Sequence, residues 1–127
     1  MPKINSRAFT TWIGENDICY TVVKENVVVE IADAIENSSS VSKLSDGKTY
    51  PMLVNLKEIK SISKEARDHF SMQNRTPGVK AIGLLIKSPA STIIGNFFLG
   101  LNKSTVPVKL FNKEEKAVTW LKQFNKK

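Results

Sequence analysis

Short β-type runs come first in the chain. Residues 8–13 and 18–23 are rich in aromatic and β-branched side chains, and the GENDI stretch between them carries the Gly, Asn and Asp that turns favour. We therefore expect a β-hairpin here, followed by a further strand segment at 27–29. Residues 1–7 and 125–127 are expected to be loose.

The hydrophobic period changes to a helical one at residue 31. Small and apolar side chains fall on one face at helical spacing: Ile31, Ala34, Ile35, Ser38 and Val41. This pattern predicts a helix that buries that face. Asp46-Gly47 is expected to end the helix, because Gly readily adopts a left-handed conformation.

Strands and helices alternate from residue 51 onward. The runs 52–56 and 81–86 are apolar throughout, which is typical of central strands covered on both faces, and 106–111 is a third strand. Ser63 and Ser88-Pro89 are good helix starts, and Asn112 with Glu115 resembles a capping box. The expected buried stripes are Ala90, Ile93, Ile94, Phe97, Phe98 and Leu101 in one helix, and Ala117, Val118, Leu121 and Phe124 in the last.

This order of elements predicts an α/β fold. The alternation favours a largely parallel sheet, and the hairpin adds antiparallel strands, so we expect a mixed sheet of about five to six strands with four helices. The 127 residues suit a single domain over residues 1–127.

Positive charge is concentrated at the carboxyl end. The chain carries a net charge of +7, and Lys is frequent from residue 103 onward. A basic end can attract nucleic acid or an anionic membrane, but it can equally be a solvated helix face. Arg is scarce, and Arg is the residue preferred for phosphate contacts, so we do not expect nucleic acid as a partner.

Three features bear on the location of the protein. No apolar run approaches the ~20 residues of a membrane-spanning helix, and the amino end has no apolar signal-peptide core. The single Cys allows no internal disulfide, which fits a reducing compartment. We therefore expect a cytoplasmic protein without a transmembrane segment.

Reactive side chains are few. His69 and Cys19 are the sole residues of their types, whereas structural zinc needs about four ligands and a nucleophile needs an adjacent base. Glu30, Asp33 and Glu36 lie near a helix start, where carboxylates are ordinary dipole partners. No glycine-rich nucleotide-binding loop occurs. We therefore expect no metal, no cofactor and no catalytic residue.

Two phrases of the sequence, MLVNLKEIKSISKEA and VKLFNKEEKAVTWLKQF, carry a resemblance to a known family. They resemble parts of STAS domains, the fold of bacterial anti-sigma-factor antagonists. The first is similar to the strand, loop and helix of that family, in which a strand ends in Asp or Asn plus Leu and Asp-Ser-Ser-Gly opens the helix. Asn55-Leu56 matches the strand end. The closing phrase F-x-x-E-x-x-A-x-x-W-L is carried by Phe111, Glu114, Ala117, Trp120 and Leu121.

The resemblance implies a switch surface at the start of the helix after residue 62. Ser63 falls on the family's Asp, whereas Lys64 and Glu65 fall on its two serines, one of which is phosphorylated in the antagonists. A carboxylate at a helix N-terminus is stable without a kinase. We expect a non-catalytic STAS-like regulatory or scaffolding module that contacts a protein partner or a second copy of itself through Glu58, Ser61, Ser63, Lys64 and Glu65.

A second hypothesis concerns the helix at 89–101. Its apolar face is wide, and a small apolar molecule or a lipid could bind against it. The residues that would line such a pocket are Ile93, Ile94, Phe97 and Phe98. Core packing against the sheet is the plainer interpretation of the same residues.

Overall fold

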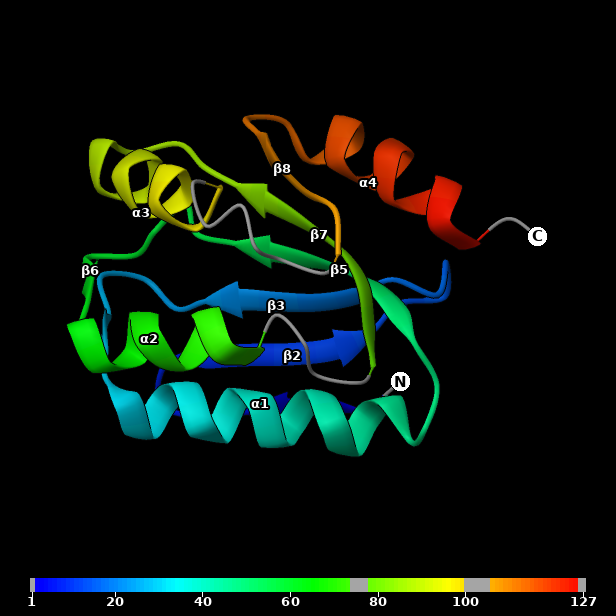
Figure 1. The fold of residues 1–127 in the computed structure, drawn as a ribbon, viewed down its shortest axis with the longest axis horizontal. Helices are drawn as coiled ribbons and strands as arrows, with labels where there is room; N and C mark the ends of the chain where they lie inside the picture. The colour runs from blue at the N-terminus through cyan, green and yellow to red at the C-terminus, as the bar shows by residue number, and fades with distance from the viewer. Residues whose placement is uncertain (1, 74–77, 100–105, 126–127) are drawn as a thin grey trace.

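The computed structural model describes residues 2–73, 78–99 and 106–125. Its main sheet has six strands in the order β1-β2-β3-β5-β7-β8 (Figure 1). The strands are β1 (Lys3–Asn5), β2 (Phe9–Ile13), β3 (Cys19–Val23), β5 (Tyr50–Asn55), β7 (Val79–Leu85) and β8 (Val108–Phe111). β1, β2 and β3 pair antiparallel, and the pairings from β3 to β8 are parallel, so the sheet is mixed as predicted.

A second, smaller sheet stands at one end of the molecule. It consists of β4 (Val28–Val29) and β6 (Ser61–Ile62), which pair in parallel. The described residues form four helices, as expected: α1 (Ile31–Ser45), α2 (Lys64–Gln73), α3 (Pro89–Leu99) and α4 (Glu114–Lys122), the last followed by the 3-10 turn η1 (Gln123–Asn125).

The central strands bury both of their faces. Met52 and Val54 of β5 pack in one apolar cluster with residues of α1, α2 and α3, whereas Leu53 packs in a second cluster with Ala117 and Leu121 of α4. β7 alternates in the same way. Three helices therefore cover one face of the sheet and α4 covers the other, as a parallel sheet with apolar strands requires.

Both ends of the described chain are more ordered than the sequence suggests. Residues 1–7 were expected to be loose, yet Lys3–Asn5 form β1 against β2. Asn125 was also expected to be loose, but its side-chain amide donates hydrogen bonds to the carbonyls of Asn16 (3.3 Å) and Asp17 (3.0 Å) in the hairpin turn. Residues 126 and 127 lie outside the described part of the chain.

Two of the three expected helix starts are confirmed. The Ser63 hydroxyl accepts a hydrogen bond from the Ala66 amide (3.1 Å), and the Ser88 hydroxyl accepts one from the Ser91 amide (3.1 Å). The capping box at Asn112 is wrong. Lys113 holds extended backbone at the N-cap, so α4 begins one residue later than that pattern requires.

The predicted buried stripes of α1 and α3 are too wide. Ile31 and Ile35 are 44% and 52% exposed, and Ile93 is 70% exposed. α3 instead packs through Ser91, Ile94 and Gly95, because the small residues let it lie close to the sheet. Leu101 lies outside the described residues.

Gly95 explains why a poor helix former stands in the middle of α3. A Cβ atom built there would lie 2.9 Å from Ile86 Cγ2 and 3.0 Å from Leu110 Cδ2, which is closer than packed carbon atoms come. Absence of a side chain therefore sets the distance between α3 and strands β7 and β8.

We expect Gly95→Ala to destabilise the protein by about 1 kcal/mol, although Ala is the better helix former, because overpacking outweighs propensity. The neighbouring exposed Asn96 provides the control. Asn96→Ala should raise the free energy of unfolding by a few tenths of a kcal/mol. Urea denaturation measures both, and a stabilising Gly95→Ala would show that the close approach is not rigid.

Candidate functional site

Backbone hydrogen bonds hold the segment after Leu56 against residues 27–29, which precede α1. The Asn55 side chain accepts a hydrogen bond from the Lys57 amide (3.0 Å), which turns the chain at the end of β5. The amides of Lys60 and Ser63 then donate to the carbonyls of Val27 and Val29, each at 2.9 Å. This loop therefore presents its side chains from a hydrogen-bonded backbone.

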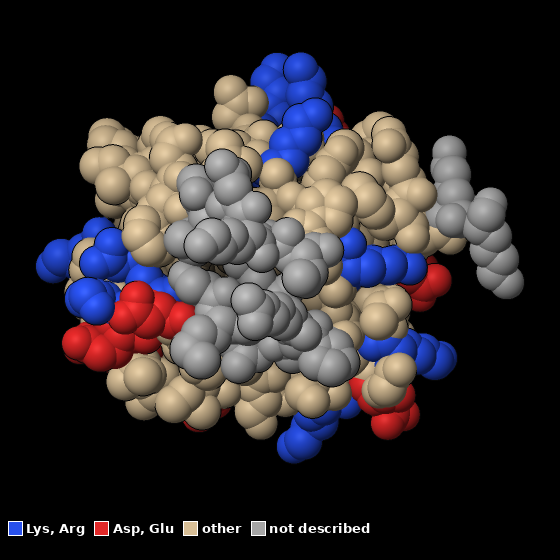
Figure 2. Space-filling view, in the orientation of Figure 1, with Lys and Arg blue, Asp and Glu red and all other residues tan. Residues whose placement is uncertain are grey.

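The start of α2 carries exposed charged side chains. Lys64 forms an ion pair with Asp68 one turn later (3.0 Å), and Glu65 lies exposed in the first turn. Figure 2 shows acidic and basic side chains beside each other over β6 and this end of α2. Ser61 and Glu58 are exposed as well, whereas Ser63 is half-buried and its hydroxyl serves as the helix cap.

Exposed aliphatic side chains lie at the same end of the molecule. Val28 is 36% exposed and pairs with Ser61 across the small sheet, and Ile31 and Ile35 follow on the first turns of α1. α1 and α2 lie side by side and run in the same direction, so their first turns share one end of the fold (Figure 1). We call this set the β4–β6 surface: Val28, Ile31, Ile35, Ser61, Lys64 and Glu65.

An ion pair fixes the position of β4. The Arg7 guanidinium donates to the Asp33 carboxylate of α1, with Nε 3.0 Å from Oδ1, and to the Val28 carbonyl at 2.7 Å. Asp33 also accepts from the Glu30 amide (2.9 Å). Burial raises the pKa of Asp33, but hydrogen bonds from Arg7 and Glu30 outweigh it, so the pKa lies below its ordinary value.

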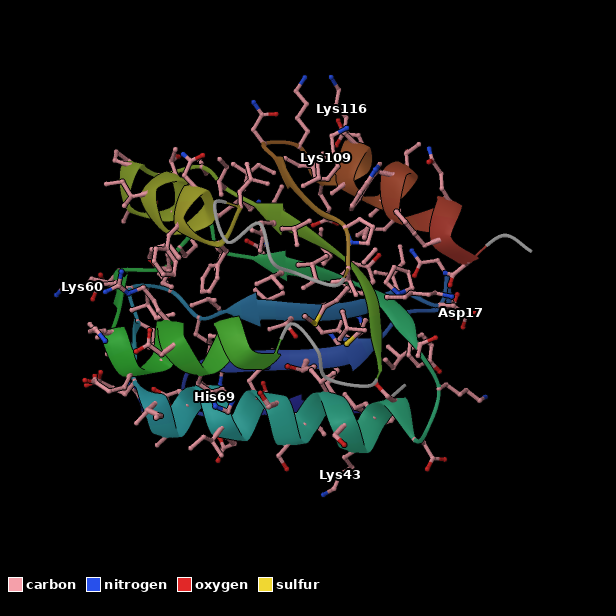
Figure 3. The ribbon with its side chains drawn as sticks, viewed as in Figure 1. Asp17, Lys43, Lys60, His69, Lys109 and Lys116 are labelled. Carbon is pink, nitrogen blue, oxygen red and sulfur yellow. The ribbon has the colours of Figure 1, made fainter. Side chains whose placement is uncertain are left out.

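The structure brings together one serine and one histidine that the sequence leaves far apart. Ser38 Oγ of α1 lies 3.0 Å from His69 Nε2 of α2; Figure 3 labels His69 between these helices. In the described chain no carboxylate is bonded to the imidazole, and Ser38 sits in mid-helix, where backbone amides are engaged in the helix itself. The pair therefore links α1 to α2 and lacks the orienting acid and the free amide donors of a hydrolase.

The remaining reactive groups are separate from one another. Burial raises the pKa of the Cys19 thiol to about 12, so it stays protonated at neutral pH. Among residues 2–73, 78–99 and 106–125, no group of three His, Cys, Asp or Glu side chains could hold a metal ion.

A cavity of about 100 Å³ lies between the sheet and the helices α1, α2 and α3. Among the described residues that line it, Thr21, Asn37 and Ser38 are polar and the others are apolar. Phe9, Phe70 and Phe98 line it with edge-to-face ring contacts, Phe70 standing 6.2 Å from each of the other two ring centroids. We call it the sheet–helix cavity.

The residues of the second hypothesis are distributed over three environments. Phe98 lines the sheet–helix cavity, and Ile94 is buried against the same cluster. Phe97 lies under the guanidinium of Arg67, 4.8 Å from its ring centroid, and Ile93 projects into solvent. These four side chains therefore do not line one pocket together, and most of the cavity wall comes from elements that the sequence did not single out.

The basic carboxyl end is partly packed on aromatic rings. Lys109 lies 5.6 Å from the ring centroid of Phe111 and 6.0 Å from that of Trp120. Figure 3 shows Lys109 and Lys116 projecting at the edge of the molecule where β8 meets α4. No described helix is long and apolar enough to cross a membrane.

Two solved structures are similar to this fold. A protein from Shewanella loihica PV-4, described as an uncharacterised member of the DUF3478 family with a SpoIIAA-like fold, matches with a TM-score of 0.66 at 13% identity, over 93% of this chain and 98% of that one. The anti-sigma factor antagonist SpoIIAA in its unphosphorylated form matches with a TM-score of 0.60 at 13% identity, over 89% and 96%. The chain therefore has a SpoIIAA-like fold, which confirms the STAS-like resemblance.

The sequence itself places the chain in a family. Residues 11–125 match the family described as a domain of unknown function, DUF7793, and the chain belongs to that family. No curated protein matches it in sequence.

We expect Asp33→Asn to lower the free energy of unfolding at pH 7 by about 1 kcal/mol, because a charge-assisted bond to a largely exposed Arg is lost. The pKa of Asp33 is depressed in the folded state, so its contribution is present above the unfolded value near pH ~3.9 and is lost as pH falls through the folded pKa. The stability difference between the two proteins should therefore shrink as pH falls and disappear once the pH lies below the folded-state pKa of Asp33.

Urea denaturation between pH 2 and pH 7 measures this difference. Glu36→Gln, an exposed carboxylate on the same helix, serves as the control and should change stability little. A gap between the Asp33 variant and the parent that is constant across this pH range would contradict the ion pair.

Proposed function

We propose that this chain is a cytoplasmic, non-catalytic regulatory module of a single STAS-like domain, which binds a protein partner through the β4–β6 surface. The observation that carries the proposal is the exposure of Val28, Ile31 and Ile35 beside the start of α2. Aliphatic side chains held in solvent by a rigid backbone cost free energy unless a partner covers them.

The chemistry around these side chains fits a protein interface. Interfaces combine an apolar centre with a polar rim that remains in contact with water. Here the aliphatic residues form the centre, and Ser61, the Lys64–Asp68 pair and Glu65 form the rim. The loop is held by backbone hydrogen bonds, so binding requires little ordering of the chain.

The residue at the start of α2 suggests that binding is constitutive. Glu65 occupies the place where the resemblance implies a phosphorylated serine, and it lies in the first turn, where a helix favours negative charge. The carboxylate supplies charge at all times, whereas phosphoserine supplies it only after a kinase acts. We therefore propose a partner that is bound without a phosphorylation cycle.

The test compares two exposed isoleucines. Tagged Ile35→Asp should lose the partner retained by the parent protein from a lysate of the producing cells, with affinity at least about tenfold weaker, because a charge would enter the apolar centre. Ile93→Asp on α3 is the matched control and should retain the partner, since Ile93 is exposed on a helix that is not part of the β4–β6 surface. Both variants should unfold at nearly the parent temperature.

Two outcomes would contradict the proposal. Equal retention by the parent and both variants would place the interface elsewhere. Size-exclusion chromatography with light scattering provides the other check: a dimer of the parent that Ile35→Asp converts to monomer would mean that the surface serves self-association instead.

A further inference from the structure

The two faces of the central strands are packed to different degrees. On β5, Leu53 belongs to the cluster with α4 and is 1% exposed, whereas Met52 and Val54 on the opposite face are only partly buried. Val108 of β8 lies on the same face as Met52 and is also partly buried. These three partly buried side chains line the sheet–helix cavity, so the helices α1, α2 and α3 leave space above the middle of the sheet. Protein cores are close-packed, which makes such a space at the centre of a small domain unusual.

The polar groups on the cavity wall already have partners within the protein. Asn37 donates from Nδ2 to Thr11 Oγ1 at 3.0 Å, and the Thr21 hydroxyl lies 3.5 Å from that of Thr11. Ser38 Oγ lies 3.0 Å from His69 Nε2. The unfilled contacts are therefore those of the apolar side chains, which lose van der Waals attraction wherever they face empty space. An apolar occupant would restore these contacts without needing a hydrogen bond.

The volume and lining of the cavity restrict its occupant. Engineered cavities of about 150 Å³ lined by Leu, Ile and Phe bind benzene. This cavity has a volume of about 100 Å³, so it suits a molecule no larger than one six-membered ring, and a long acyl chain would not fit. Among the described residues that line it none is charged, so an ion would be buried without a counter-charge.

The rings on the wall favour an aromatic occupant. Phe70 makes edge-to-face contacts with Phe9 and Phe98, with 6.2 Å between ring centroids in each case. All three rings line the cavity, so a further ring placed there can pack against them with the same geometry. Such contacts stabilise an aromatic pair beyond the burial of its area.

We propose that the sheet–helix cavity is a binding site for a small neutral aromatic molecule of one ring, held by apolar contacts alone. The site differs from the pocket suggested by the sequence, with which it shares Phe98. None of the described residues that line it belongs to the β4–β6 surface, so failure of either proposal leaves the other standing.

Benzene and benzoate are the first probes, because they share a ring and differ by a carboxylate. Titration of the full-length protein with benzene, followed by two-dimensional methyl NMR, should give saturable shifts for methyl groups that line the cavity. Benzoate should bind at least about tenfold more weakly, because its charge would be buried without a partner. Absence of saturable shifts at millimolar benzene would overturn the proposal, and so would equal affinity for the two probes.

A cavity-filling variant tests the location. Val54→Leu adds a methylene group to the wall and should weaken benzene binding at least about tenfold. Val118→Leu is the matched control, because Val118 packs in the cluster with α4, and it should leave the dissociation constant unchanged. Val108→Leu provides a second filled variant if Val54→Leu does not fold. Equal binding by a folded filled variant and the parent would place benzene outside the cavity.

An enlarged cavity provides the opposite test. Leu84→Ala removes most of one side chain from the wall, so this variant should bind para-xylene at least about tenfold more tightly than the parent does. Ile82→Val is the milder variant if Leu84→Ala does not fold. A folded enlarged variant that gains no affinity for para-xylene would show that the volume of the cavity does not select the ligand.

Discussion

The architecture depends on two central strands that must be shielded from water on both faces of the sheet. β5 and β7 place apolar side chains on both sides of the sheet, Met52 and Val54 on one side and Leu53 on the other. Such strands require helices on both faces, and the parallel connections between them supply those helices. The small sheet lies on the way to two of these helices, since β4 stands between β3 and α1 in the chain and β6 stands between β5 and α2.

Much of this arrangement can be predicted from the sequence, because it is determined by residues that are close together in the chain. The hairpin, the alternation of strands and helices and the caps at Ser63 and Ser88 all depend on neighbouring residues. The stripes of α1 and α3 were misjudged because periodicity finds an apolar face but not its width. Ile35 and Ile93 lie at the margins of those faces, and only the position of the neighbouring elements decides that they meet water.

The candidate sites also divide into features set by neighbouring residues, which the sequence predicts, and contacts between distant residues, which it does not. Ser63 as a cap was predictable, since its hydroxyl bonds three residues away, whereas the Ser38–His69 contact joins positions 31 residues apart. The sheet–helix cavity draws its wall from strands and helices along most of the chain, so no short phrase could indicate it.

The three consecutive valines 27–29 leave open which side of β4 faces the core. A shift of one residue in a strand reverses its faces, and alternation of apolar and polar side chains normally forbids this. Val28 and Val29 are chemically identical, so their side chains cannot specify the register. The backbone does so instead, through the Val27 and Val29 carbonyls bound by the following loop and the Val28 carbonyl bound by Arg7. A single exposed arginine thus helps decide which of two equal side chains is presented to the outside and which is enclosed.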